Sequence, residues 1–147
     1  MSNVQARSSE EIASSLREWF AGETLPGVVS AYLFGSHAEG RAHRESDVDV
    51  AVLLDWAAYP GSSERFDARV RLTSEVIGAL HRNQVDLVVL NDVPPELGRK
   101  VVQDGVRVYV ADAELDHAYV RDVQLRAADL DPWLRRMRRI ALERILG

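Results

Sequence analysis

The sequence of 147 residues contains no cysteine, a single lysine and no long apolar run. The lack of cysteine excludes disulfide bonds and metal sites that are built from thiolates. No segment approaches the ~18 apolar residues that a membrane-spanning helix requires, and no apolar signal core follows the N-terminus. We therefore expect a protein of the cytoplasm that makes no contact with a membrane.

The net charge is negative, but the C-terminal end of the chain is positively charged. The net charge of −5 argues against non-specific adhesion to nucleic acid, so no direct nucleic-acid binding is expected. Residues 131–147 hold five arginines against Asp131 and Glu143, which gives +3 and leaves −8 for the other 130 residues. A solvated helix face explains these arginines most simply, and a partner-binding surface is the alternative.

The length suits one domain over residues 1–147, and 46% hydrophobic with 28% charged residues is typical of a soluble globular protein. Short apolar runs alternate with segments that have helical spacing of apolar residues. We expect an α/β (α+β) fold, in which helices flank a small mixed sheet of about four strands. The core would span about 28–110, with C-terminal helices at about 112–146. Strands are predicted at 28–34, 47–54, 85–90 and 106–110, and helices at 8–22, 64–80, 95–103, 112–129 and 131–146.

Apolar spacing also predicts which helix faces are buried. The first helix, capped by Ser8, has one apolar stripe: Ile12, Leu16, Trp19 and Phe20. The long middle helix has its own stripe: Phe66, Val70, Thr73, Ile77 and Leu80. The last helix, which restarts at Asp131-Pro132, has a third: Leu134, Met137, Ala141 and Ile145.

Punctuating residues predict how the second half of the chain turns. Gly105 is expected to close the helix before it in the left-handed conformation. The strand at 106–110 alternates with Arg107 and Tyr109, which favours an edge strand with one wetter face. Asp112 is expected to cap the helix that follows.

Two acids stand at the start of the second strand and share one face of it. Successive side chains of a strand point to opposite faces, so Asp47 and Asp49 lie on the same side, about 6.6–6.8 Å apart along the backbone. The opposite face carries the residues expected in the core: Val48, Val50, Val52 and Leu54. Asp86 begins the third strand in the same manner. If the two strands are neighbours, three carboxylates converge at one edge of the sheet.

Three close anions repel one another unless a cation neutralises them or one takes up a proton. Carboxylate oxygen is the preferred ligand of hard divalent cations. Such a trio suits two magnesium ions ~3.5–4 Å apart, which keep coordination positions open for substrate phosphates. The alternative for an Asp-x-Asp pair taken alone is a solvated strand end.

Gly35-Ser36 supplies the phosphate site that such metals imply. A glycine directly after a strand lets the backbone turn tightly and approach a phosphate closely. A short helix expected within residues 37–46 would add partial positive charge at its N-terminus. Arg41 in the same loop is a candidate phosphate contact, although a loop arginine faces solvent about as often.

The motif of Gly35-Ser36, ten intervening residues and Asp47-Val48-Asp49 resembles the GS-x10-DxD signature of the DNA polymerase beta-like nucleotidyltransferase superfamily. More narrowly, the chain resembles the minimal nucleotidyltransferase (MNT) antitoxins of HEPN/MNT toxin–antitoxin pairs. The similarity covers roughly 28–110 and includes Gly40, Ser46-Asp47, Asp86 and the 104–109 segment. The chain departs from the family at His37 and Glu39, where arginines are frequent.

The resemblance implies a nucleotidyltransferase (polymerase beta-like) fold with a helical C-terminal arm and a role for each motif residue. Asp47 and Asp49 would hold two Mg²⁺ ions, and Asp86 would complete one metal site and help to deprotonate the acceptor hydroxyl. Gly35 and Ser36 would grip the β- and γ-phosphates of ATP. Arg41 and Ser46 would complete the nucleotide site.

Three functions are compatible with this resemblance. The favoured one is a Mg-dependent antitoxin that transfers AMP from ATP to a tyrosine hydroxyl of its cognate HEPN toxin, with which it forms a hetero-oligomer. The alternatives are an aminoglycoside-type, small-molecule adenylyltransferase and a non-enzymatic antitoxin that acts by binding alone. Only 37 residues follow Val110, which leaves little chain for a substrate domain. The Arg-x(4–6)-His motif of HEPN nucleases is absent, so the toxin must be another chain.

Other residues that invite a functional interpretation have simpler explanations. The four histidines lack metal-ligand spacing and are expected at the surface. Trp56 and Tyr59 are expected to pack over a loop, with stacking on a nucleobase as the alternative.

Overall fold

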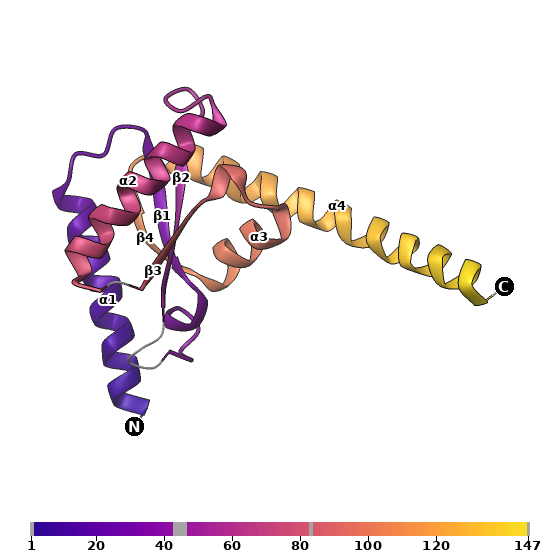
Figure 1. The fold of residues 1–147 in the computed structure, drawn as a ribbon, viewed down its shortest axis with the longest axis horizontal. Helices are drawn as coiled ribbons and strands as arrows, with labels where there is room; N and C mark the ends of the chain where they lie inside the picture. The colour runs from indigo at the N-terminus through magenta and orange to yellow at the C-terminus, as the bar shows by residue number, and fades with distance from the viewer. Residues whose placement is uncertain (1, 43–46, 83, 147) are drawn as a thin grey trace.

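The computed structural model describes residues 2–42, 47–82 and 84–146 and confirms the predicted class, a four-stranded mixed sheet flanked by helices (Figure 1). The strands are β1 (Val28–Phe34), β2 (Val48–Leu54), β3 (Val85–Val89) and β4 (Val106–Val110). The α-helices are α1 (Ser2–Gly22), α2 (Ser62–Leu80), α3 (Pro95–Asp104) and α4 (Ala113–Leu146), and the 3-10 turns are η1 (Gly35–His37) and η2 (Leu90–Asp92). In this described part of the chain, no helix has the length and apolarity that a membrane crossing requires.

The sheet has the strand order β3-β2-β1-β4. β1 pairs antiparallel with both β2 and β4, whereas β2 and β3 are parallel. The nearly continuous apolar run of β1 therefore fits its central position, and β4 is an edge strand, as its alternation predicts. The parallel pairing of β2 with β3 brings together the two strands that begin with acids.

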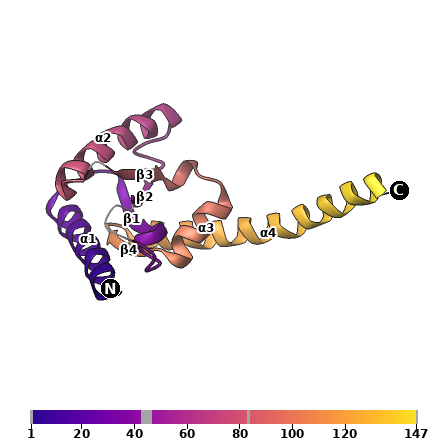
Figure 2. The same cartoon turned by 60° about the horizontal axis from the view of Figure 1, so that its bottom comes forward.

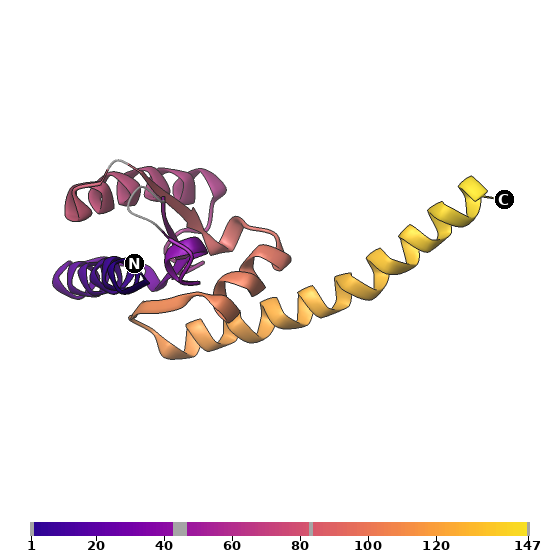
Figure 3. The same ribbon diagram turned by 90° about the horizontal axis from the view of Figure 1, so that it is seen from below.

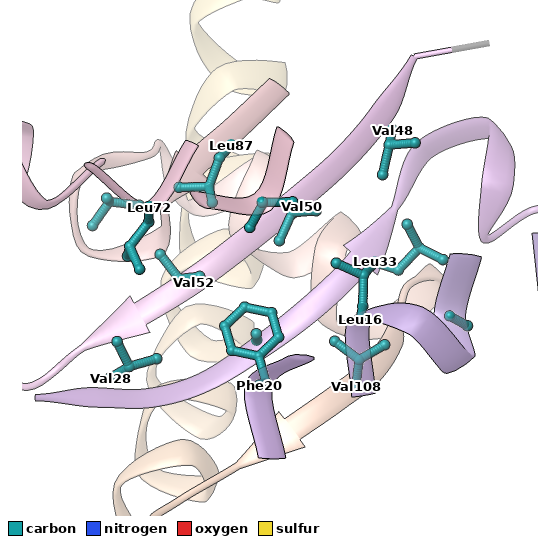
Figure 4. Packing of buried hydrophobic residues seen from close by; sticks show 14 of the residues in the cluster. Leu16, Phe20, Val28, Leu33, Val48, Val50, Val52, Leu72, Leu87 and Val108 are labelled. Carbon is teal, nitrogen blue, oxygen red and sulfur yellow. The ribbon is translucent and has the colours of Figure 1, made fainter. Parts of the chain in front are cut away.

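Helices cover both faces of the sheet, with α1 and α2 on one face and α3 and the first part of α4 on the other (Figures 2 and 3). The predicted alternation of β2 is confirmed. Its inward residues lie in one buried cluster with α1 and α2: Val48, Val50, Val52 and Leu54. Figure 4 shows the first three of them in this cluster. Ala51 and Leu53 pack on the opposite side with Val101 of α3. Asp49 belongs to that second face.

The predicted stripe of α1 is confirmed, but the helix begins earlier than expected. Ile12, Leu16 and Phe20 are buried, and the Phe20 ring stacks on Tyr109 of β4 with centroids 5.3 Å apart. The helix starts at Ser2 and runs through the predicted cap at Ser8. Residues 3–7 include alanine, glutamine and arginine, whose helix propensity is high, so nothing in this segment forces the helix to begin at Ser8.

The predicted buried face of α2 is wrong in the first half of the stripe, whereas its later residues are half-buried and Leu80 packs against the core. Phe66 is 60% exposed and Val70 is 52% exposed. The helix instead buries a different set of residues: Arg65, Ala68, Leu72 and Val76. Arg65 is tolerated inside because its Nε donates to both Asp92 carboxylate oxygens, at 3.1 and 3.0 Å, and its Nη1 donates to a backbone carbonyl. A buried arginine with such partners carries no apolar signal in the sequence.

The two C-terminal helices that were predicted at 112–129 and 131–146, with a break before Pro132, form one helix, α4. Its start agrees with the prediction, since Asp112 Oδ1 accepts a hydrogen bond from the Leu115 amide at 3.1 Å. Pro132 lies inside the helix, where it removes one backbone hydrogen bond without ending the helix. Strong helix formers such as Leu134 and Met137 continue the helix after it.

The second half of α4 leaves the body of the protein as an extended arm (Figure 1). Ala127 is fully buried, whereas the apolar residues of the arm stay largely uncovered within this chain. The predicted stripe of this segment is therefore apolar but is not packed against the chain's own core: Leu134, Met137, Ala141 and Ile145.

Gly105 does not adopt the predicted left-handed conformation. Its φ of −80° and ψ of 169° are extended. A Cβ atom at this position would collide with the Val101 carbonyl oxygen and lie 3.0 Å from that of Leu33. Close approach of the backbone, rather than a special dihedral angle, explains the glycine.

Candidate active site

The parallel pairing of β2 and β3 sets two of the three predicted acids side by side. Asp49 and Asp86 are partners in the strand register. Neighbouring strands lie ~4.7–4.9 Å apart, so the two Cα atoms are immediate neighbours and both side chains point to the face of α3 and α4. Asp47 lies directly before β2, two residues upstream of Asp49.

Asp49 lies close enough to the other two acids to be influenced by their charges. Partial burial raises the pKa of the Asp49 carboxyl above its ordinary value, and the negative charges of Asp86 and Asp47 raise it further. Asp47 and Asp86 are exposed, whereas Asp49 is half-buried. The site therefore concentrates negative charge around one carboxylate that has lost part of its hydration.

These carboxylates have the donor chemistry that a hard divalent cation requires, since all three supply oxygen. Within the ranges that the structure describes, no three acidic, histidine or cysteine side chains already stand in the geometry of a metal site. The Asp86 carboxylate is turned toward Arg69, whose Nη2 lies 3.7 Å from Asp86 Oδ1. The assignment of Asp47, Asp49 and Asp86 as metal ligands stays a prediction.

Gly35 lies against Asp49, so the structure brings the predicted phosphate loop and the acids together. Its φ of +75° is in the left-handed region. A Cβ atom here would collide with Asp49 Oδ2 and lie 3.1 Å from its Cγ. Both the turn and the contact therefore require glycine at this position.

The described part of the loop after Gly35 has its helical turn earlier than predicted. This turn is η1 (Gly35–His37), whereas the prediction placed a short helix within residues 37–46, of which 43–46 lie outside the described residues. The Gly35 carbonyl accepts hydrogen bonds from the amides of Ala38 and Glu39, both at 3.1 Å, and the Ser36 carbonyl accepts from the Arg41 amide at 3.0 Å. These bonds fix the turn directly beside Asp49.

The remaining loop residues differ in their outcome. Arg41 is exposed, and its Nη2 pairs with Glu39 Oε2 at 2.7 Å, which lowers the pKa of the Glu39 carboxyl. A nucleotide contact of Arg41 therefore stays a prediction. Ser46 lies outside the described residues. The expected surface position of His37 is wrong, because this residue is buried with Nδ1 3.3 Å from Ser9 Oγ.

If the acids carry the nucleotidyl transfer that the resemblance implies, substitution of Gly35 by alanine should reduce it by at least ~10-fold, because the new Cβ displaces the Asp49 carboxylate. Gly40→Ala is a matched control, since Gly40 has a similar φ of +72° and open space around its Cβ position. Both variants should lose a similar ~1 kcal/mol of unfolding free energy from backbone strain. Transfer rates of the two variants, measured beside thermal unfolding, separate strain from displacement. Equal transfer rates would contradict the proposed role of this contact.

Trp56 does not adjoin the acids. It follows β2, at the opposite end of the strand from Asp49, and its ring stacks on the Arg65 guanidinium, 4.7 Å from ring centroid to Cζ. It also lines a half-open pocket of about 210 Å³ together with Leu53, Leu115 and Tyr119. The packing interpretation of Trp56 agrees with this position better than stacking on a nucleobase bound at Asp49.

A polar network that the sequence analysis missed joins β1, β4 and α4 around a buried carboxylate, with the Arg107 side chain 45% exposed. Tyr32 Oη donates to Asp116 Oδ1 at 2.6 Å, and Arg107 Nη1 donates to Asp116 Oδ2 at 2.8 Å. Asp116 is fully buried. Burial, reinforced by the Asp116 carboxylate, raises the pKa of the Tyr32 hydroxyl. The available signal was a tyrosine in a buried strand, since its hydroxyl needs a partner there.

Comparisons with known proteins place most of the chain in a family. Residues 16–114 match the family model described as "Polymerase beta, Nucleotidyltransferase". Protein adenylyltransferase MntA of Shewanella oneidensis is 34% identical over 89 residues, which are 59% of this chain and 58% of that protein. The aligned chain thus spans less than two thirds of this curated relative.

Two solved structures extend the comparison to nearly the whole chain. The crystal structure of a toxin–antitoxin with AMP-PNP is 26% identical with a TM-score of 0.60, over 95% of this chain and 98% of that chain. The structure of tri-AMPylated Shewanella oneidensis HEPN toxin in complex with MNT antitoxin is 20% identical with a TM-score of 0.51 over both whole chains, which shows a shared fold. Because the family model matches well over half of the sequence, this chain belongs to the polymerase beta nucleotidyltransferase family.

Proposed function

We propose that this protein is a Mg-dependent nucleotidyltransferase that transfers AMP from ATP to a tyrosine hydroxyl of a cognate HEPN toxin, and that it thereby acts as an antitoxin in the cytoplasm. The observation that carries the proposal is the meeting of Gly35, Asp49 and Asp86 at one place. Asp86 is adjacent to Asp49 through the strand register, and Gly35 is adjacent through direct contact.

The residues fit a division of labour in this reaction. Asp47, Asp49 and Asp86 would hold the divalent ions, which supply neutralisation of the triphosphate charge. Gly35 lets the backbone approach the β- and γ-phosphates, and the Ser36 hydroxyl donates a hydrogen bond to their oxygens. The tyrosine oxygen bonds to the α-phosphorus, the bond to the bridging α–β oxygen breaks, and pyrophosphate leaves. Asp86, the more exposed acid of the register pair, accepts the hydroxyl proton.

The similar proteins support the choice of substrate and partner. The curated relative is named a protein adenylyltransferase, and the 26% identical structure is a toxin–antitoxin bound to an ATP analogue. The uncovered apolar side chains of the α4 arm are consistent with a protein that works in a complex. A partner-binding arm also agrees with the second interpretation of the C-terminal arginines.

Incubation with α-labelled ATP, Mg²⁺ and the toxin from the neighbouring gene tests this function. We expect label on a toxin tyrosine, with none when Asp49→Asn replaces the wild-type protein. An antitoxin that acts by binding alone would neutralise the toxin without label. Folded wild-type protein that leaves the toxin unlabelled therefore contradicts the transferase.

A further inference from the structure

Arg69 of α2 reaches across to β3 and contacts it at two adjacent residues. Its Nε donates to the Leu87 carbonyl oxygen at 2.7 Å, and its Nη2 lies 3.7 Å from Asp86 Oδ1. β3 is an edge strand, so its outer backbone groups have no strand partner on that side. The bond to Leu87 thus anchors the guanidinium beside Asp86.

The positive charge of Arg69 lies beside one of the three acids of the candidate active site. Asp86 stands next to Asp49 in the register of β2 and β3. Arg69 places a positive charge on the outer side of Asp86, on the helix that covers the other face of the sheet from Asp49. In this arrangement Asp86 has an ion-pair partner on α2 in addition to its register partner Asp49.

The ion pair between Arg69 and Asp86 is weak enough to be broken by a competing cation. Both side chains are solvated, with Arg69 45% exposed and Asp86 59% exposed. An exposed ion pair at this distance is weak. A divalent cation attracts the carboxylate more strongly, because its charge is twice that of the guanidinium. Arginine suits the position better than lysine, because its planar fork can bond the Leu87 carbonyl and face Asp86 at once.

We propose that Arg69 is a positioning residue that holds the Asp86 carboxylate and competes with the divalent cation for it. The inference rests on the proposed metal site. Cation binding draws the Asp86 carboxylate off Arg69, while the bond to Leu87 keeps the guanidinium in place. Arg69 therefore sets how much cation is needed to complete the trio.

Direct measurement of Mn²⁺ binding tests this competition without ATP or toxin. Arg69→Gln is expected to bind Mn²⁺ roughly three- to tenfold more tightly than the wild-type protein, because the competing charge is gone. Arg71→Gln is the matched control on the same helix. Arg71 is exposed and donates to the Tyr59 hydroxyl at 3.2 Å, so its loss should change the Mn²⁺ affinity less than twofold.

Two further variants separate a contact with Asp86 from a general field effect. In an Asp86→Asn background, Arg69→Gln should leave Mn²⁺ affinity unchanged, because the contact is already lost. Arg69→Lys keeps the charge but loses the fork, so its affinity should lie between those of the wild-type protein and Arg69→Gln. This variant also tests the proposal if Arg69→Gln does not fold.

The possible results distinguish this inference from the proposed function. Mn²⁺ binding to the wild-type protein with no gain in Arg69→Gln and Arg69→Lys overturns the competition and leaves the metal site standing. An equal gain in the Asp86→Asn background also overturns it, since the effect then does not act through Asp86. No Mn²⁺ binding to any variant removes the metal site and the competition together.

Discussion

Asp49→Asn is expected to abolish AMP transfer, by at least ~10³-fold, while making the folded protein more stable. The amide is a poorer cation ligand than the carboxylate, so the charge on the triphosphate is no longer neutralised at the site. The same substitution removes a half-buried charge that is repelled by Asp86 and Asp47. We expect a gain of about 0.5–1 kcal/mol in unfolding free energy, which is the size of the Coulomb repulsion between neighbouring unit charges in water.

The stability of the wild-type protein should also depend on pH through this residue. Because the pKa of Asp49 is raised, the folded state binds its proton more tightly than the unfolded chain, whose value is ~3.9. Protonation of Asp49 therefore contributes to the unfolding free energy. This contribution is fully present below the pKa of the unfolded chain and is lost as the pH rises through the raised pKa of the folded state. Asp49→Asn should flatten the corresponding part of a plot of unfolding free energy against pH.

Urea denaturation and the transfer assay, applied to the same preparations, check both effects. Asp67→Asn on the exposed surface of α2 is a suitable control, because it removes one negative charge away from the acid trio. It should change transfer by less than twofold. Full transfer by the Asp49→Asn protein would contradict the role of Asp49 in the reaction. Loss of its stability and fold would show that Asp49 serves the core instead.

Asp116→Ala is expected to cost about 2–4 kcal/mol of unfolding free energy. The substitution leaves the buried Tyr32 hydroxyl without its acceptor and the Arg107 guanidinium without its carboxylate. Asp116→Asn keeps an acceptor for Tyr32 and loses the ion pair, so its cost should be intermediate. The three residues link β1, β4 and α4, so the loss is global rather than local.

A second ion pair of α4 provides the control for this prediction. Asp122 and Arg126 are both exposed and lie 3.2 Å apart at helical spacing. Asp122→Ala should cost less than ~0.5 kcal/mol, as exposed helical pairs do. Urea denaturation of both variants decides the matter, and equal costs would refute the importance of burial for the Asp116 network.

The part of the fold that follows from local pattern was predictable from the sequence. The pleat of a strand separates Asp49 from Val48 and Val50, and the short apolar run of β1 indicates a central strand. Each inference needs neighbouring residues alone. The adjacency of Asp49 and Asp86 needed one further fact, the pairing of β2 with β3, which the structure supplies.

The features that were missed depend on residues distant in the sequence. Arg65 is buried because Asp92, 27 residues away, accepts its hydrogen bonds, and this changes the face that α2 presents to the sheet. Tyr32 and Asp116 are separated by 84 residues. Pro132 is a helix-ending signal that the surrounding helix formers outweigh. In each of these cases tertiary contact or summed propensity overrides the local signal.

Diffraction from crystals grown with Mn²⁺ and a non-hydrolysable ATP analogue, at a wavelength where manganese scatters anomalously, tests the central claim most directly. We expect an anomalous peak within bonding distance of the Asp47 and Asp49 carboxylates, the triphosphate against Gly35 and Ser36, and Asp86 turned from Arg69 toward the metal. A bound nucleotide with no manganese at these carboxylates, or with the metal held elsewhere, would contradict the assignment of this site.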